Sequence, residues 1–183
     1  MQNEVIIFPT DTVYGIGAGL YDEEGIKRIY KIKGRDFNKP LAVLCANLEQ
    51  IETFAIVDKR VKLIAKLFWP GGLTLILKTN DSYFNKTKEK TIGVRIPKHK
   101  FAQRLLIDRG PMKTTSVNTS GEEPLNDYGV IYKKYHNVVN YIYENDEDID
   151  GVSSTVIDLT EELKVIREGN IKIEDILNCL KES

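Results

Sequence analysis

VIIFPTDTVYGIG, residues Val5–Gly17, joins a short apolar run to a polar turn punctuated by glycines. The four β-favouring residues Val5–Phe8 predict a buried strand, and Pro9 ends it because proline has no N–H to donate to a neighbouring strand. The residue before a proline is held extended, so the polar side chains after Pro9 are expected at the carboxyl end of this strand, where open α/β sheets bind ligands. An ordinary corner, with Asp11 in an Asx-turn, is the alternative interpretation of this segment alone.

The rest of the chain alternates strand-like and helical patterns, with capping residues at the helix boundaries. Asp22 suits the N-cap of the first helix and Gly34 suits the position after its end, so residues 5–33 are expected to form a strand, a turn and a helix. The polar segment 79–90 is expected to be a loop. Further strands are expected over 41–45, 73–78, 91–96, 112–116, 138–143, 154–158 and 163–167, and further helices over 47–54, 58–68, 101–109, 127–135 and 173–180.

These elements predict a single α/β domain over residues 1–183, with a large, twisted, mixed sheet and flanking helices. A chain of 183 residues with 42% hydrophobic and 29% charged residues is ordinary for one globular domain. The net charge of -1 provides no overall basic field for nucleic acid. No apolar run approaches the roughly 20 residues of a membrane span, and the N-terminus lacks the features of a signal peptide, so we expect a cytoplasmic protein.

Familiar catalytic and cofactor-binding signatures are missing from the sequence. His99 and His136 lie far apart and without metal-ligand spacing, so no protein metal site is predicted. No P-loop motif occurs, and the segment Gly15–Leu20 lacks the last glycine of the dinucleotide-binding fingerprint. The two cysteines, Cys45 and Cys179, are expected to be buried thiols rather than a disulfide.

Five cations lie near the ends of predicted strands or helices, namely Lys33, Arg35, Lys39, Arg95 and Arg167. Each of them, taken alone, is better explained as a solvated surface charge. Together with hydroxyl clusters at 10–12, 114–116 and 153–155, they predict a cationic cavity for a polyanion and a small polar ligand, because guanidinium groups match phosphate and carboxylate oxygens. A nucleotide fits that description.

Seven motifs occur in the order seen in the YrdC-like family, which comprises the threonylcarbamoyl-AMP synthases. The chain resembles that family over essentially its whole length, and we expect the short, single-domain form. The motifs are PTDTVYGIG (9–17), KGR (33–35) with KPL (39–41), WPGGLT (69–74), IGVRIP (92–97), SVN with SG (116–118 and 120–121), STVID (154–158) and REG (167–169).

The resemblance implies an adenylyl transfer. Threonine and bicarbonate or CO₂ would form a carbamate, whose oxygen attacks the α-phosphate of ATP and expels pyrophosphate. The product, L-threonylcarbamoyladenylate, would pass to the tRNA threonylcarbamoyl-transferase machinery for the t6A modification. Mg²⁺ would arrive with ATP, held mostly by phosphates and water. Stable nucleic-acid binding and membrane association are not expected.

The resemblance also assigns roles to individual residues. Lys33 and Arg35 would be catalytic, and Arg95 would hold the carboxylate of threonine because a bidentate guanidinium suits it. The ATP side would consist of Lys33, Arg35, Lys39, Thr91, Ser116, Asn118 and Arg167, and the threonine side of Thr12, Arg95, Thr114 and Ser154.

The sequence departs from the family pattern at a few positions. Asp11 stands where glutamate is common, SVN replaces SAN, and WPGGLT replaces WPGPLT. Leu44 stands where many relatives have a histidine bordering the threonine site, so a different seating of the amino acid is expected here. The loop 121–127 is a candidate lid because it follows the SVN motif and contains Gly, Pro and Asn.

Two other functions compete with this interpretation. The first is a double-stranded RNA-binding module without ATP turnover, against which the net charge of -1 and the acidic run 144–150 argue. The second is a carbamoyl-adenylate-forming domain of the kind found in hydrogenase-maturation proteins, which is normally embedded in a much longer chain.

Overall fold

One mixed sheet of nine strands runs through the computed structural model, which describes residues 3–181. Its strand order is β7-β1-β2-β6-β3-β5-β4-β8-β9, with parallel pairs β1–β7, β3–β5 and β4–β8 among antiparallel ones. The predicted α/β fold with a large mixed sheet is confirmed. The strands are β1 (Ile6–Phe8), β2 (Gly15–Gly19), β3 (Ala42–Leu44), β4 (Leu73–Lys78), β5 (Thr91–Arg95), β6 (Met112–Ser116), β7 (Tyr141–Ile142), β8 (Thr155–Asp158) and β9 (Lys164–Arg167).

The helices begin where the sequence places short polar caps. Side chains of Asp22, Asn47 and Asp58 each accept a hydrogen bond from the backbone N–H three residues on, and Gly34 ends the first helix in the left-handed conformation. These helix boundaries are therefore confirmed. The helices are α1 (Glu23–Lys33), α2 (Leu48–Glu52), α3 (Lys59–Phe68), α4 (Asp81–Thr87), α5 (Lys100–Arg109), α6 (Tyr128–Tyr135) and α7 (Ile173–Lys181).

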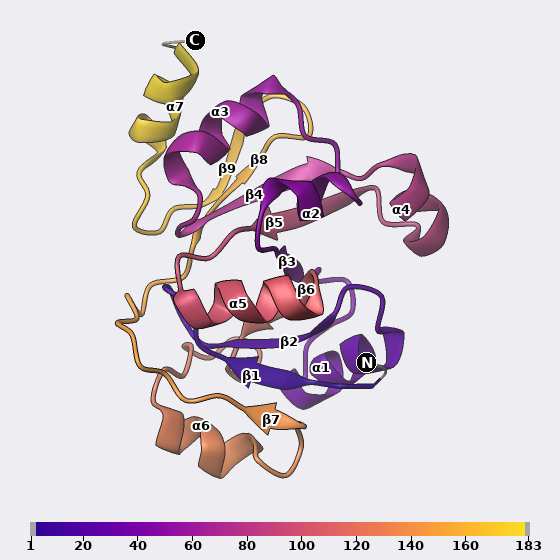
Figure 1. The fold of residues 1–183 in the computed structure, drawn as a ribbon, viewed down its shortest axis with the longest axis vertical. Helices are drawn as coiled ribbons and strands as arrows, with labels where there is room; N and C mark the ends of the chain where they lie inside the picture. Colours follow the sequence, from indigo (N-terminus) through magenta and orange to yellow (C-terminus); the bar gives the residue numbers. More distant parts are fainter. Residues whose placement is uncertain (1–2, 182–183) are drawn as a thin grey trace.

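The two faces of the sheet are covered unequally. One face carries two separate apolar clusters, one packed with α1 and α6 and the other with α2, α3 and α7. On the other face, α5 covers only the end where Phe8, Leu44 and Met112 lie. Figure 1 shows α5 crossing the half of the twisted sheet that contains β1 and β2, and α2 and α3 over the half that contains β4 and β8.

The uncovered part of the second face carries small and polar side chains. Residues paired across strands share a face, so the pairs Gly17↔Thr114 and Ala42↔Thr114 place these residues of β2, β3 and β6 on this surface. The pair Ile76↔Asp158 extends it across β4 and β8. This half-open face is where a ligand can reach the centre of the sheet.

The predicted glycine-rich turn after Tyr14 is wrong, because Gly15–Gly19 forms strand β2, antiparallel to both β1 and β6. Gly15 and Gly17 are needed for packing within the sheet. A Cβ on Gly17 would lie 2.8 Å from Thr114 Oγ1, so only glycine leaves room for that side chain. The Asx-turn alternative is also wrong, since the Asp11 carboxylate instead pairs with Arg95.

Two further predictions are corrected by the structure. The expected loop 79–90 contains α4, which is capped by Asn80 and held by the fully buried Tyr83. Tyr83 Oη donates to Glu89 Oε2 at 2.6 Å, and the centroid of its ring lies 5.7 Å from that of Phe54, so packing against a residue outside the segment stabilises a helix where the composition suggests a loop. The expected strand 138–143 is reduced to Tyr141–Ile142 at the sheet edge, because Val138 and Val139 form a turn after α6.

Candidate active site

A cavity of about 630 Å³ occupies the uncovered part of the second sheet face. Side chains from β3, β4, β5, β6, β8 and β9 line it, together with the loops after β1 and α1. All but two of the predicted site residues contribute to its wall. These are Thr12, Arg35, Lys39, Thr91, Arg95, Thr114, Ser116, Ser154 and Arg167.

The other two predicted residues, Lys33 and Asn118, lie behind the wall. Lys33 is 2% exposed, and its ammonium donates to Ser116 O at 2.5 Å, to Asn118 O at 3.0 Å and to Asn118 Oδ1 at 2.6 Å. Burial, with the positive charge of Arg35 as a second cause, lowers the pKa of Lys33 to about 8. Lys33 thus holds the Ser116 end of the cavity wall in place, and its catalytic role remains a prediction.

The 34–40 loop after α1 presents two cations to the cavity. Arg35 Nε donates to Lys39 O and its Nη2 to Pro40 O, both at 3.1 Å. Both acceptors are neutral carbonyls, and within residues 3–181 neither Arg35 nor Lys39 pairs with a carboxylate. The positive charge of this loop is therefore available to an anionic ligand.

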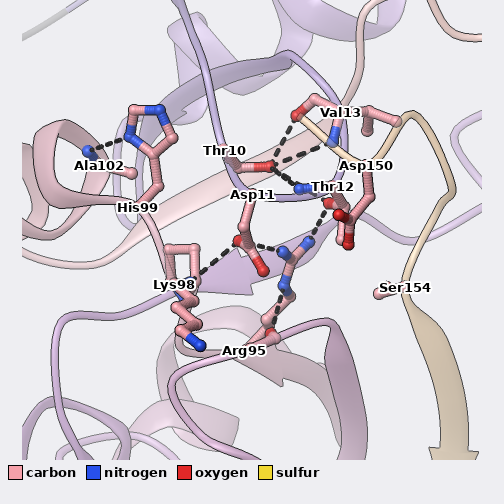
Figure 2. Close-up of polar contacts among 12 residues, drawn as sticks. Thr10, Asp11, Thr12, Val13, Arg95, Lys98, His99, Ala102, Asp150 and Ser154 are labelled. Carbon is pink, nitrogen blue, oxygen red and sulfur yellow. Dashed lines mark hydrogen bonds and ion pairs between the residues drawn. The ribbon is translucent and has the colours of Figure 1, made fainter. Parts of the chain in front are cut away.

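The Arg95 corner, which we define as residues 10–13 with Arg95, is built differently (Figure 2). The Arg95 guanidinium donates to Asp11 Oδ1 at 2.5 Å, to Thr12 Oγ1 at 2.6 Å and to Gly71 O at 2.9 Å. Burial lowers the pKa of Arg95 while Asp11 opposes that shift, and a guanidinium stays charged in any case. This corner therefore holds a buried cation that is already compensated by a carboxylate.

Hydroxyl groups of β4 and of the segment before β8 lie at the floor of the cavity. Thr74 Oγ1 and Ser154 Oγ are 2.8 Å apart, and Arg167 donates to Ser154 O through Nε at 3.0 Å and through Nη2 at 2.8 Å. Asp158, the one acidic residue among the described residues that line the cavity, accepts from both the N–H and the hydroxyl of Thr160.

The sequence placed Asp11 at the ligand-binding end of the first strand but did not show its pairing with Arg95, and it did not indicate Thr74 or Asp158 as members of the site. For Asp158 a signal existed, because alternate residues of a strand share a face and Asp158 follows the predicted cavity residue Ser154 by four positions in the expected strand 154–158. The loop 121–127 is joined to the wall by Asn126 Oδ1, which accepts from Tyr14 N at 3.1 Å. Its movement as a lid stays a prediction.

A half-open α/β sheet with a cationic, hydroxyl-rich cavity is the architecture of a ligand-binding or group-transfer domain. A family model named Sua5/YciO/YrdC, with the description "Telomere recombination", matches residues 1–169. The chain belongs to this family, so the resemblance seen in the sequence motifs is confirmed.

Individual relatives agree with this membership. The chain is 34% identical to a threonylcarbamoyl-AMP synthase from Pyrococcus abyssi, over 99% of this chain and 55% of that protein. It is also 34% identical to a putative threonylcarbamoyl-AMP synthase from Methanocaldococcus jannaschii, over 98% of this chain and 86% of that protein. The chain thus spans about half the length of the P. abyssi protein.

A crystal structure of P. abyssi Sua5 complexed with L-threonine superposes with a TM-score of 0.88 at 33% identity. The match covers 98% of this chain and 54% of that one. Among the helices of residues 3–181, none has both the length and the apolar character that a membrane span requires.

Proposed function

We propose that this chain synthesises L-threonylcarbamoyladenylate from L-threonine, bicarbonate or CO₂, and ATP, with release of pyrophosphate. The observation that carries the proposal is the composition of the cavity. It joins Arg35, which donates to two neutral carbonyls, and Lys39, which pairs with no carboxylate within residues 3–181, to a separate arginine that is already paired with a carboxylate. The first arrangement suits a polyanion such as ATP, and the second suits the carboxylate of an amino acid.

The chemistry requires no protein nucleophile. A carbamate oxygen attacks the α-phosphorus of ATP, the bond from that phosphorus to the bridging oxygen breaks, and pyrophosphate leaves. The protein's contribution is to align the two reactants and to neutralise phosphate charge. Arg35 and Lys39 would do the latter, since a cation about 4 Å from a phosphate charge gains roughly 4 kcal/mol at an effective dielectric near 20.

The amino-acid side of the cavity would be formed by the Arg95 corner with Thr114 and Ser154. Arg95 makes three hydrogen bonds to the protein, and its remaining N–H groups would donate to the threonine carboxylate. Leu44 lines the cavity near this end of the sheet, where its apolar side chain can contact the methyl group of threonine.

Mg²⁺ would enter as part of the ATP substrate. This ion is commonly held by phosphate oxygens, water and one or two carboxylates, and Asp158 is a carboxylate in the cavity wall. We further propose that the protein works in the cytoplasm and that its product is passed to the tRNA threonylcarbamoyl-transferase machinery. The names of the relatives favour this function over a double-stranded RNA-binding module.

The test is pyrophosphate release from Mg²⁺ and ATP, with threonine and bicarbonate omitted in turn, and mass spectrometry of the adenylate. Release that requires both components, with serine as a poor substitute for threonine, is expected. Absence of release under every combination, accompanied by salt-dependent RNA binding, would reject the synthase and support the binding module.

A further inference from the structure

The Asp11 carboxylate lies just outside the cavity wall and contacts the residue that lines it. Its Oδ1 accepts from Arg95 Nη2 at 2.5 Å and from the Lys98 backbone N–H at 3.0 Å (Figure 2). The Asp11 backbone is held as well, since Asp150 N donates to Asp11 O at 3.0 Å. Hydrogen bonds thus hold both the backbone and the side chain of Asp11, and its carboxylate in turn orients the Arg95 guanidinium.

The resulting ion pair is buried. The Arg95 side chain is 7% exposed and the Asp11 side chain 14%. A buried guanidinium without a carboxylate partner would be a strong site for any small anion, because charge-assisted hydrogen bonds strengthen away from water. Phosphate groups are such anions, and the reaction proposed above supplies them as ATP and as pyrophosphate.

We propose that Asp11 is a positioning and specificity residue for the amino-acid end of the cavity. It orients Arg95 so that the remaining N–H donors meet one carboxylate, and its charge prevents this corner from becoming a second phosphate site. The identity of the amino acid in this proposal rests on the proposed function. The exclusion of phosphate from the Arg95 corner does not.

The test compares wild type with Asp11→Asn by isothermal titration with L-threonine, ATP and inorganic phosphate. In the variant, threonine should bind about tenfold more weakly or worse, because the guanidinium loses its orienting partner. ATP affinity should stay within about threefold, since no ATP-side residue is changed. Inorganic phosphate should compete with threonine in the variant and not in the wild type.

Two further variants separate positioning from stability. Asp11→Glu keeps the charge and should retain threonine binding without phosphate competition. Glu89→Gln removes the carboxylate from another ion pair, in which Glu89 Oε1 lies 2.5 Å from Lys113 Nζ and the Lys113 side chain is 10% exposed. Neither member of that pair lines the cavity. Glu89→Gln should lower the melting temperature and leave threonine and phosphate binding unchanged.

Unchanged threonine affinity in Asp11→Asn would overturn the positioning role, and absence of phosphate competition would overturn the specificity role. If Asp11→Asn folds only when phosphate is present, the proposal is supported, and if it fails to fold in either condition, Asp11→Ser undergoes the same titrations. A wild-type protein that does not bind threonine would contradict the proposed function, whereas the phosphate titrations would still decide the role of the Asp11 charge.

Discussion

The 34–40 loop and the Arg95 corner line the same cavity, yet they hold their arginines in opposite ways. Arg35 is oriented by two backbone carbonyls, which satisfy N–H donors and leave the positive charge uncompensated. Arg95 is oriented by a carboxylate, a hydroxyl and a carbonyl, which satisfy donors and also neutralise the charge. Both side chains are pre-oriented, but only one of them offers a net charge.

This difference teaches that the partner of a basic residue, rather than its presence, decides which anion it can receive. A polyphosphate requires uncompensated cations, because several negative charges must be neutralised together. A single carboxylate beside an amine depends more on the orientation of the N–H donors than on the net positive charge of the site. Substitutions in the 34–40 loop should therefore affect ATP, and substitutions in the Arg95 corner should affect threonine.

The largest effect is expected from Arg35→Ala. Loss of a charge that neutralises phosphate in the transition state should reduce turnover by about 10³-fold, comparable to removal of a transition-state donor. The fold should persist, because Arg35 lies beyond the end of α1 and its side chain donates to backbone carbonyls of its own loop. Pyrophosphate release and the melting temperature are the measurements. An active or an unfolded variant would contradict the role given to the 34–40 loop.

Arg95→Gln should break the other region. Threonine affinity should fall by about 10²-fold while ATP still binds, because a charge-assisted pair to the carboxylate is lost. The variant also leaves the buried Asp11 carboxylate without its cation, which typically costs about 3–5 kcal/mol of stability. Separate titrations of threonine and ATP, with chemical denaturation, would test this. Equal losses for both ligands would show that the two regions do not act separately.

The pH dependence of ATP binding should further separate the 34–40 loop from the Arg95 corner, because Lys33 is the titrating cation behind that loop. Since its pKa is lowered to about 8, the ammonium should lose its proton as the pH rises through that value, well below the ordinary range for lysine. ATP affinity should then decline, on the order of tenfold, as one positive charge and one N–H donor disappear. In Lys33→Gln the affinity should be lower throughout and flat over the same pH range.

The smallest effect is expected from Thr74→Val on the cavity floor. Removing the 2.8 Å contact between Thr74 Oγ1 and Ser154 Oγ should cost about 1 kcal/mol and weaken threonine binding several-fold. Calorimetric titration and thermal melting measure both. If the variant instead changes ATP affinity, Ser154 belongs to the ATP-binding part of the cavity.

The sequence predicted most elements whose signals are local. Asp22 and Gly34 bound α1 because a short acidic side chain and a left-handed glycine act within a few residues. Strand β2 was missed because glycine has low β-propensity, and the reason for glycine at position 17 lies in neighbouring strands, where Thr114 of β6 and Phe8 of β1 leave no room for a Cβ.

The site residues also divide into those with a local sequence signal and those that depend on distant contacts. The cations of the 34–40 loop could be predicted, because they follow a recognisable helix end in a family motif. The partner of Arg95 could not, since the pairing of Asp11 with Arg95 spans 84 residues and depends on how β5 is placed beside the corner. Lys33 was predicted on the ATP side, and its hydrogen bonds to Ser116 and Asn118 depend on packing that the sequence does not show.

The order in which the chain folds also follows from its topology. The cavity floor is closed by the parallel pairing of β8 with β4, which brings Thr74 beside Ser154, 80 residues later in the chain. Contacts of such long range form slowly, because the loop must be closed before they contribute free energy. Ligand binding should consequently return late in refolding, after the helical signal. Stopped-flow refolding in the presence of ATP would resolve the recovery of helical signal from the recovery of ATP binding.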